Sequence, residues 1–197
     1  MKPTNNPQVN SKVYWNHIYT TPAKELEYWT DTARFPTALT YVKDGDSFLD
    51  LGCGVGVLCR MVATQRKNCR VWGVDISDEV IEKNRSELPE VRWKQGYIGS
   101  LEFLPETYFD VVFCGETIEH LDDPAVLFAD AARVLKPGGK LIITTPIEDH
   151  IDSPEHVWEF EKADIEKLYK DAGFSSVEFV DLPDTEYLVV FFAVGTK

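Results

Sequence analysis

The chain has 197 residues, of which 44% are apolar, so it is long enough and apolar enough to fold as one domain around a buried core. Its 33 acidic residues outnumber its 20 basic ones and give a net charge of -13, which disfavours a protein that holds nucleic acid by neutralising phosphates. The four cysteines form no CxxC pair, the polar N-terminus carries no export signal and the longest apolar run has the length of a strand, so we expect a cytoplasmic protein without a membrane span.

The N-terminal residues 1–42 differ from the rest of the chain. They are rich in aromatic side chains and are interrupted by prolines, which favours short helical pieces. Aromatic residues at helical spacing usually pack as core, and they can also close over a ligand. Residues 1–42 are therefore a candidate helical cover, part of the same domain as residues 43–197.

From residue 43 onward, strand-like apolar runs alternate with helical patterns. Strands are predicted at 47–51, 70–75, 91–95, 109–115 and 140–145. Helices are predicted at 55–66, 78–88, 124–135 and 162–172. Two last strand-like runs, at 176–180 and 187–194, lie close together in the chain. The alternation predicts βαβ units with a parallel sheet, and the last two runs predict an antiparallel hairpin.

The stretch "FLDLGCGVGVL" is the first strand with the turn that follows it. The strand carries Asp50, and glycine then occupies every second position as Gly52, Gly54 and Gly56. In an open α/β sheet the first such turn is the usual ligand cradle, and glycine there permits close approach to the backbone. The next strand ends in Asp75, a carboxylate that can accept hydrogen bonds from both hydroxyls of a ribose. A ribose-bearing cofactor is predicted, and a tight turn without a ligand is the alternative.

The glycine spacing decides between cofactors. A dinucleotide site has the pattern GxGxxG, whereas this turn reads GxGxG and follows an acid, which weakens the case for NAD. The pattern DxGxGxG resembles the class I S-adenosylmethionine-dependent methyltransferases. "FDVVFCGETIEHL" is similar to that family's fourth strand and loop, and "LKPGGKLIITTP" to its fifth strand. The resemblance covers about residues 45–195. It implies a Rossmann-like α/β fold, with a seven-stranded, mostly parallel sheet, helices on both faces and a C-terminal antiparallel hairpin.

The same resemblance implies how S-adenosyl-L-methionine is bound. The glycines of the turn would pass under its methionine part, and Asp50 would hold the turn and face the ammonium group. Asp75 would bind the ribose and Ile76 would lie against the adenine. The aromatic segment "VYWNHIY" resembles the family's N-terminal cover, which implies that Tyr14 and Trp15 both pack as core and touch the cofactor. Many family members carry an acid after the third strand that accepts from the adenine amino group. This chain has Tyr97 there, so adenine recognition is expected to involve its hydroxyl or the backbone.

The loop "GETIEHL" beyond the fourth strand carries Glu116, Glu119 and His120. Methyl transfer from a sulfonium is an in-line displacement, so the protein has to align the acceptor and take up a proton when the acceptor is a hydroxyl. If residues 116–120 form a helical turn, spacings of three and four place all three side chains on one face. Two carboxylates and an imidazole there would serve as catalytic groups or as ligands of a divalent cation.

A similar ExxEH run occurs in ubiquinone-pathway O-methyltransferases and in small-RNA 2′-O-methyltransferases. The second branch has a further histidine after the fifth strand, and "HVWEF" resembles that element, which makes His156 a fourth candidate ligand of Mg²⁺, Mn²⁺ or Zn²⁺. Such an ion would bind a vicinal diol and lower the pKa of the attacking hydroxyl. In the alternative without a metal, Glu116 and Glu119 are solvated acids, His120 is a lone base or orienting group, and His156 packs with Trp158.

The first functional hypothesis is an S-adenosylmethionine-dependent methyltransferase that O-methylates a small hydroxylated molecule, with metal assistance as an option. A second hypothesis is 2′-O-methylation of RNA ends, which the negative charge and the lack of a basic tract oppose. A third is a catalytically silent family member that binds the cofactor or a partner. An NAD-linked oxidoreductase is the fourth, and the glycine spacing disfavours it.

Overall fold

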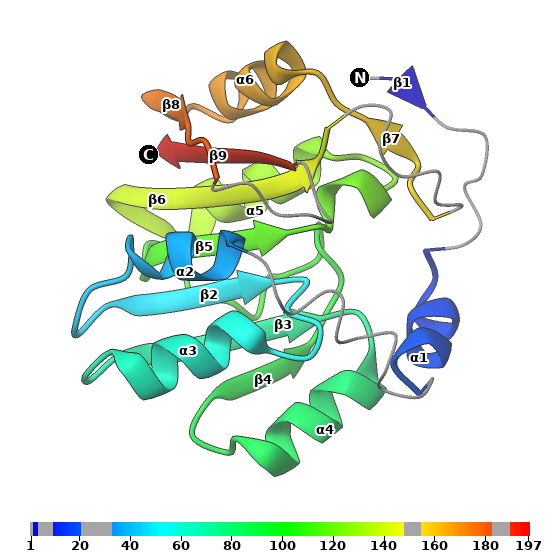
Figure 1. Ribbon diagram of the computed structural model, residues 1–197, viewed down its shortest axis with the longest axis vertical. Coiled ribbons are helices and arrows are strands. Elements are labelled where there is room, and N and C mark those ends of the chain that lie inside the picture. Colours follow the sequence, from blue (N-terminus) through cyan, green and yellow to red (C-terminus); the bar gives the residue numbers. More distant parts are fainter. Residues whose placement is uncertain (1, 4–9, 21–32, 148–154, 183–189) are drawn as a thin grey trace.

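The computed structural model describes residues 2–3, 10–20, 33–147, 155–182 and 190–197 (Figure 1). Its main sheet contains the strands β2 Ser47–Leu51, β3 Arg70–Asp75, β4 Arg92–Gln95, β5 Phe109–Gly115, β6 Leu135–Pro146, β8 Ser176–Phe179 and β9 Val190–Thr196. These seven strands lie in the order β4-β3-β2-β5-β6-β9-β8. Strands β4 to β6 pair in parallel, and β9 pairs antiparallel with both β6 and β8. The prediction of a mostly parallel sheet with a C-terminal antiparallel hairpin is confirmed.

Helices cover both faces of this sheet (Figure 1). One face packs against α2 Arg34–Leu39, α3 Val57–Gln65 and α4 Asp78–Glu87. The other packs against α5 Ala125–Val134 and α6 Lys162–Asp171. All five residues of β2 are buried, as expected for a central parallel strand covered on both sides. This burial explains why the residues on both sides of Asp50 are apolar.

Most element boundaries agree with the sequence to within one residue, and three differ by more. The last strand, predicted at 187–194, is β9 and ends at Thr196; residues 187–189 lie outside the described residues. The first long helix begins at Val57 rather than Val55, because Gly56 is its N-cap with a left-handed φ of 74°. Strand β6 begins at Leu135, which pairs with Phe109 before the register shifts at the "KPGGK" turn. The strand was predicted to begin only after that turn.

The described part of the N-terminal cover, residues 1–42, contains the helices α1 and α2 and a short strand. Helix α1 Lys12–Thr20 lies beside the carboxyl ends of the parallel strands (Figure 1). Strand β1 Lys2–Pro3 pairs antiparallel with β7 Trp158–Glu159, a pairing that the sequence did not predict. The division of the chain into cover and domain at residue 42 stays a prediction. Among the described residues, no helix is long and apolar enough to cross a membrane.

Candidate functional site

The glycine turn joins β2 to α3 at the carboxyl edge of the sheet. Gly52 and Gly54 have φ values of 72° and 48°, a region that strains any residue with a side chain. A Cβ on Gly52 would lie 2.3 Å from the Thr117 Oγ1 atom, so the turn also passes close to the loop after β5. Glycine is therefore required here both by the backbone conformation and by the close approach of two loops.

Two buried carboxyl groups support the turn. Asp75 accepts hydrogen bonds of 2.9 Å from the backbone N–H of Gly54 and of Ser77, one at each carboxyl oxygen. Asp50 faces the Cys59 thiol, whose Sγ lies 3.7 Å from its Oδ2 atom. Burial raises the pKa of Asp50 to about 7 and that of Asp75 to about 6. Since each carboxyl oxygen offers two acceptor positions, Asp75 retains the capacity to bind ligand hydroxyls.

The other two residues predicted for the cofactor lie at the same edge. Ile76 follows Asp75 directly, is half-buried and has its backbone carbonyl bonded to the Gln95 side chain at 3.2 Å. Tyr97 follows the end of β4, and its side chain is 50% exposed. Both are therefore placed where the sequence expected them, next to the carboxyl ends of β3 and β4.

Helix α1 brings its aromatic side chains to two different parts of this edge. The ring of Trp15 lies edge-on to that of His120, with centroids 5.0 Å apart, and Tyr14 lies beside the Glu155 carboxylate. The residue over the glycine turn is Tyr19, whose hydroxyl is 3.0 Å from the position that a Cβ on Gly54 would occupy. Tyr19 was not among the predicted site residues. The sequence signal for it is its position four residues after Trp15, which places both on one helical face.

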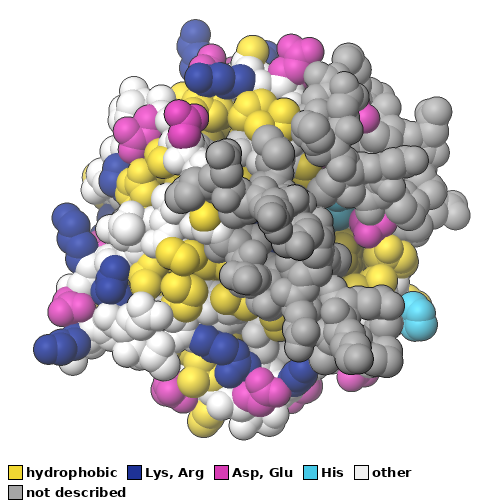
Figure 2. All heavy atoms as spheres, viewed as in Figure 1, with side chains coloured by type: hydrophobic (Ala, Val, Ile, Leu, Met, Phe, Trp, Pro, Cys, Tyr) yellow, Lys and Arg dark blue, Asp and Glu magenta, His cyan; other side chains and the backbone are white. Residues whose placement is uncertain are grey.

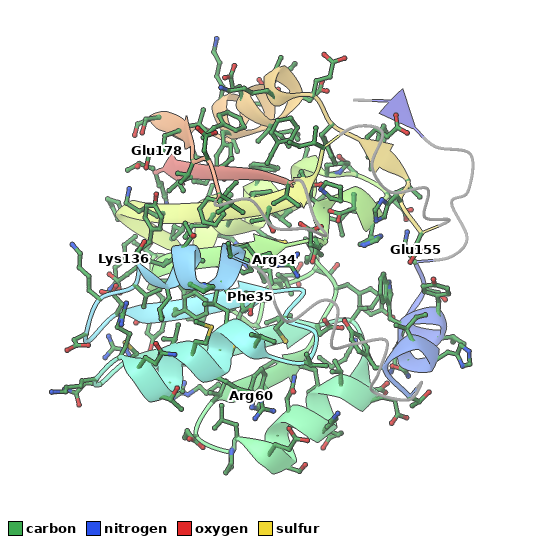
Figure 3. The ribbon with its side chains drawn as sticks, in the orientation of Figure 1. Arg34, Phe35, Arg60, Lys136, Glu155 and Glu178 are labelled. Carbon is green, nitrogen blue, oxygen red and sulfur yellow. The ribbon has the colours of Figure 1, made fainter. Side chains whose placement is uncertain are left out.

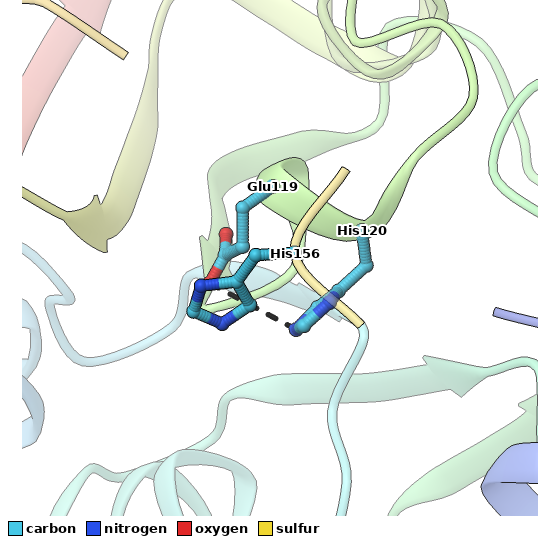
Figure 4. A group of neighbouring side chains, drawn as sticks. All are labelled: Glu119, His120 and His156. Carbon is cyan, nitrogen blue, oxygen red and sulfur yellow. Dashed lines mark ion pairs between the residues drawn. The ribbon is translucent and has the colours of Figure 1, made fainter. Parts of the chain in front are cut away.

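Glu119, His120 and His156 converge beyond the end of β5 (Figure 4). One ligand atom from each lies within 4.8 Å of the others. The first two come from a short 3₁₀ helix, η3 Ile118–His120, and His156 follows β6 in the chain. The structure thus brings together three of the four side chains that the sequence proposed as metal ligands.

One hydrogen bond of His120 fixes its tautomer, and hence which ring nitrogen carries a lone pair. Nδ1 lies 2.9 Å from the backbone carbonyl oxygen of Glu155, which can only accept, so Nδ1 carries the proton. Nε2 then presents its lone pair, 3.9 Å from the Oε1 atom of Glu119. Burial lowers the pKa of His120 to about 4, so its imidazole is neutral at physiological pH.

The Glu119 carboxyl group is held in a similar way. Its Oε2 atom accepts a hydrogen bond of 3.1 Å from the Thr145 hydroxyl, whereas buried Oε1 has no hydrogen-bond partner among the described residues. Burial, together with the neighbouring Glu116 carboxylate, raises the pKa of Glu119 well above its usual range. An unpartnered carboxyl oxygen and an imidazole lone pair facing each other are the donor set of a cation site, and His156 adds a second nitrogen.

Glu116 is not one of these three ligands, although its carboxylate lies near enough to Glu119 to raise the pKa of that group. It has a φ of 50° and precedes η3, so the expected helical turn over 116–120 is not formed and the three-and-four spacing does not create a common face. Its carboxylate instead lies 3.4 Å from the Arg34 guanidinium at the start of α2 (Figure 3). Arg34 was not predicted as a site residue, because a single arginine inside a helical pattern carries no motif.

Comparisons with known proteins agree with this geometry. The methyltransferase domain family, Methyltransf_11, matches residues 49–143, from the first strand through the middle of β6. The chain belongs to the class I S-adenosylmethionine-dependent methyltransferases. The matched residues include the glycine turn, Asp75 and the Glu119–His120 pair, whereas Tyr19 and His156 lie outside them.

Two curated relatives and one solved structure illustrate the similarity. The chain is 33% identical over 127 residues to trans-aconitate 2-methyltransferase of Azoarcus sp., covering 64% of this chain and 49% of the relative. It is 36% identical over 121 residues to ubiquinone biosynthesis O-methyltransferase of Vibrio cholerae, covering 56% and 48%. The chain thus spans about half the length of these relatives.

The solved structure is a methyltransferase in complex with the Trm112 methyltransferase activator of Haloferax volcanii. It superposes with a TM-score of 0.73 at 20% identity and covers 95% of this chain and 96% of its own. At that identity the superposition shows a shared fold alone.

Proposed function

We propose that this chain transfers the methyl group of S-adenosylmethionine to a hydroxyl group of a small molecule. The observation that carries the proposal is the placement of His120, with a buried and unprotonated Nε2 atom, at the same sheet edge as the glycine turn. The similarity to a relative named as ubiquinone biosynthesis O-methyltransferase supports it.

In this proposal the glycine turn and the strand ends bind the cofactor. Asp75 accepts hydrogen bonds from the ribose, and Asp50 supports the turn and faces the ammonium group of the methionine part. Ile76 and Tyr97 border the adenine. The cofactor supplies an electrophilic methyl carbon on a positively charged sulfur.

The acceptor side is formed by the Glu119–His120–His156 cluster. His120 Nε2 accepts the proton of the acceptor hydroxyl while the acceptor oxygen bonds to the methyl carbon and the C–S electrons return to sulfur. Glu119 stabilises the resulting imidazolium, and the Glu155 carbonyl holds the ring in the required tautomer. Because His120 has a pKa of only about 4, proton uptake needs an acceptor that is itself acidified.

In an alternative form of the site, a divalent ion held by Glu119, His120 and His156 would lower the pKa of a bound hydroxyl. The Nε2 lone pair would then bind the ion, so His120 would be a ligand and not the proton acceptor, and the hydroxyl proton would pass to solvent. Two imidazoles and one carboxylate suit Mn²⁺ or Zn²⁺ better than Mg²⁺, which prefers oxygen ligands. The Thr145 hydroxyl and the Glu155 carbonyl would then be the outer partners that orient Glu119 and His120.

RNA 2′-O-methylation remains the second candidate, since the same cluster would suit a ribose diol. The net charge of -13 opposes it. On the face shown in Figure 2, basic side chains are interspersed with acidic ones and do not gather in one patch.

Methyl transfer from radiolabelled cofactor tests the proposal. The purified protein is assayed with a panel of catechols, hydroxy acids and carboxylic acids and with short RNA, with and without Mn²⁺. We expect label to appear in a small hydroxylated acceptor, and His120→Ala to lower turnover while leaving S-adenosylhomocysteine binding unchanged. Labelled RNA would favour the second candidate. Cofactor binding without any transfer would indicate a catalytically silent member, and no cofactor binding at all would refute the proposal.

A further inference from the structure

Helix α1 is positioned between the two halves of the proposed site. Near its end, the Tyr19 hydroxyl occupies the space directly over Gly54, on the side of the turn where a ligand would approach. One helical turn earlier, the Trp15 ring packs edge-on against His120. The two rings lie 6.2 Å apart between centroids, so one short helix reaches both the glycine turn and the acceptor cluster.

The Tyr19 phenol has the properties of a ligand-binding group. Burial, with the nearby Asp75, Cys53 and Asp50 groups, raises its pKa well above 10.0, so the hydroxyl stays protonated and can donate a hydrogen bond. It is the far end of a side chain that can rotate, in contrast to the rigid backbone beneath it. A ligand on the turn must therefore either contact this hydroxyl or displace it.

The helix is fixed to the rest of the domain through α4. The Asn16 side chain donates to the Asp78 carboxylate at 2.7 Å and accepts from the Ser77 hydroxyl at 2.7 Å. Lys12 adds an ion pair to Asp78 at 2.5 Å. Ser77 is the N-cap of α4 and lies two residues after Asp75, the last residue of β3, so α1 is tied to the segment proposed to hold the ribose.

We propose that α1 is a wall shared by both half-sites, in which Tyr19 is a cofactor-binding residue and Trp15 is a positioning residue for His120. Tyr19 hydrogen-bonds the methionine part of S-adenosylmethionine over Gly54. Trp15 fills the space beside the imidazole and keeps its Nε2 directed toward Glu119. The inference rests on the proposed function, because it takes S-adenosylmethionine as the ligand of the glycine turn.

Calorimetry with S-adenosylhomocysteine tests the role of Tyr19. Tyr19→Phe removes only the hydroxyl and should weaken binding about 3- to 10-fold. Tyr19→Ala, which also removes the ring, should weaken binding further. Tyr41→Phe is the matched control, since Tyr41 stacks on Phe192 away from the turn, and it should bind as the original protein does.

Unchanged affinity in Tyr19→Phe, or tighter binding in Tyr19→Ala, would overturn the inference, because Tyr19 would then be a bystander or a plug. These results leave the proposed function intact as long as the original protein binds S-adenosylhomocysteine and Asp75→Ala binds it more weakly. Absence of binding by the original protein would overturn both. Thermal unfolding confirms that each variant is folded, and Tyr19→Phe alone carries the test if Tyr19→Ala is not.

Nitrogen-15 NMR of the histidine rings tests the role of Trp15. Trp15→Ala should shift the ring nitrogens of His120 and raise the population of its other tautomer, whereas Val13→Ala, on the 79% exposed side chain of the same helix, should not. Asn16→Ala loosens the attachment of α1 to α4, so it should both weaken S-adenosylhomocysteine binding and shift the His120 nitrogens. The proposal of a shared wall would be overturned if Asn16→Ala changed only the binding or only the His120 nitrogens. It would also be overturned if Trp15→Ala left the His120 nitrogens unshifted.

Discussion

The Nε2 atom of His120 faces the Oε1 atom of Glu119 at 3.9 Å, deep in the carboxyl edge of the sheet. The Nδ1 atom of this imidazole donates its proton to the Glu155 carbonyl, so the Nε2 atom carries no proton that could be shared with Glu119. Two buried acceptors in this arrangement repel each other unless a cation lies between them. That cation is either a proton on Glu119 or a metal ion, and the nearby His156 favours the metal.

The first prediction is that the protein, once a chelator has removed any metal, binds one Mn²⁺ or Zn²⁺ ion. His156→Ala should weaken binding roughly 100-fold, and Thr145→Val, which frees the second oxygen of Glu119, roughly 10-fold. Electron paramagnetic resonance with Mn²⁺ or calorimetry with Zn²⁺ measures both. Glu116→Gln is the comparison: Glu116 is not among the three ligands, so this change should weaken binding far less than His156→Ala does. Equal losses in Glu116→Gln and His156→Ala would contradict the three-residue site.

A second prediction concerns the buried ion pair of Arg34 and Glu116, whose charged atoms are 3.4 Å apart. Glu116→Gln removes one charge that faces the buried Arg34 guanidinium, so it should destabilise the protein by ~1 to 3 kcal/mol. The double variant Arg34→Met with Glu116→Gln should cost less than the sum of the single changes. Urea unfolding of the original protein, the two single variants and the double variant measures the four free energies of this double-mutant cycle.

The exposed pair Lys167–Asp171 on α6 is the comparison, and its loss should cost less than about 1 kcal/mol. Strictly additive single changes at Arg34 and Glu116 would show that the two charges do not depend on each other. Glu116 would then remain available as a ligand or base.

The sequence predicted the sheet and the glycine turn well because both depend on local patterns. The apolar runs around Asp50 and Asp75 mark strands that are buried on both faces, and parallel strands place their ends at one edge. Once the sheet was correct, these two carboxylates had to lie close to the turn. His156 was found through its resemblance to a family element, since its approach to His120 depends on the path of the chain after β6.

The residues that sequence reasoning missed depend on tertiary contacts. Tyr19 reaches the glycine turn because α1 lies beside the strand ends, and Arg34 reaches Glu116 because α2 packs on one face of the sheet. No local spacing encodes either packing. Glu116 was placed on a helical face with Glu119, but its left-handed backbone and the short 3₁₀ turn direct it to Arg34. One residue with positive φ ends the helical geometry on which the three-and-four spacing depends. For a residue other than glycine, such as Glu116, this conformation is seen only in the structure.

A third prediction uses the pKa of Asp50, which burial raises from 3.8 to about 7. Between these values the folded protein binds more protons than the unfolded chain, so the free energy of unfolding falls as the pH rises from 4 to 7. Asn at this position cannot ionise, so Asp50→Asn should gain stability relative to the original protein over the same interval. The gain should level off above pH 7, on the order of 4 kcal/mol.

Urea unfolding at several pH values between 4 and 8 measures this difference. Other titrating groups, such as His120, are present in both proteins and cancel in the comparison. A difference that does not change with pH would mean that Asp50 is ionised in the folded protein throughout, with a cation beside it.

The last prediction separates two reasons for glycine in the turn. Gly138 has a φ of 77° and open space where a Cβ would be, so Gly138→Ala should cost only the left-handed backbone penalty of ~1 kcal/mol. Gly52→Ala adds a Cβ 2.3 Å from Thr117 Oγ1 and should cost clearly more. Gly54→Ala, where the nearest atom is the hydroxyl of Tyr19 at 3.0 Å, should unfold like Gly138→Ala and yet lose S-adenosylhomocysteine affinity at least 10-fold, because the methyl group occupies the face that the cofactor needs. Urea unfolding and calorimetry on the three variants give both quantities. If Gly54→Ala binds the ligand as tightly as Gly138→Ala does, the cofactor does not lie over this turn.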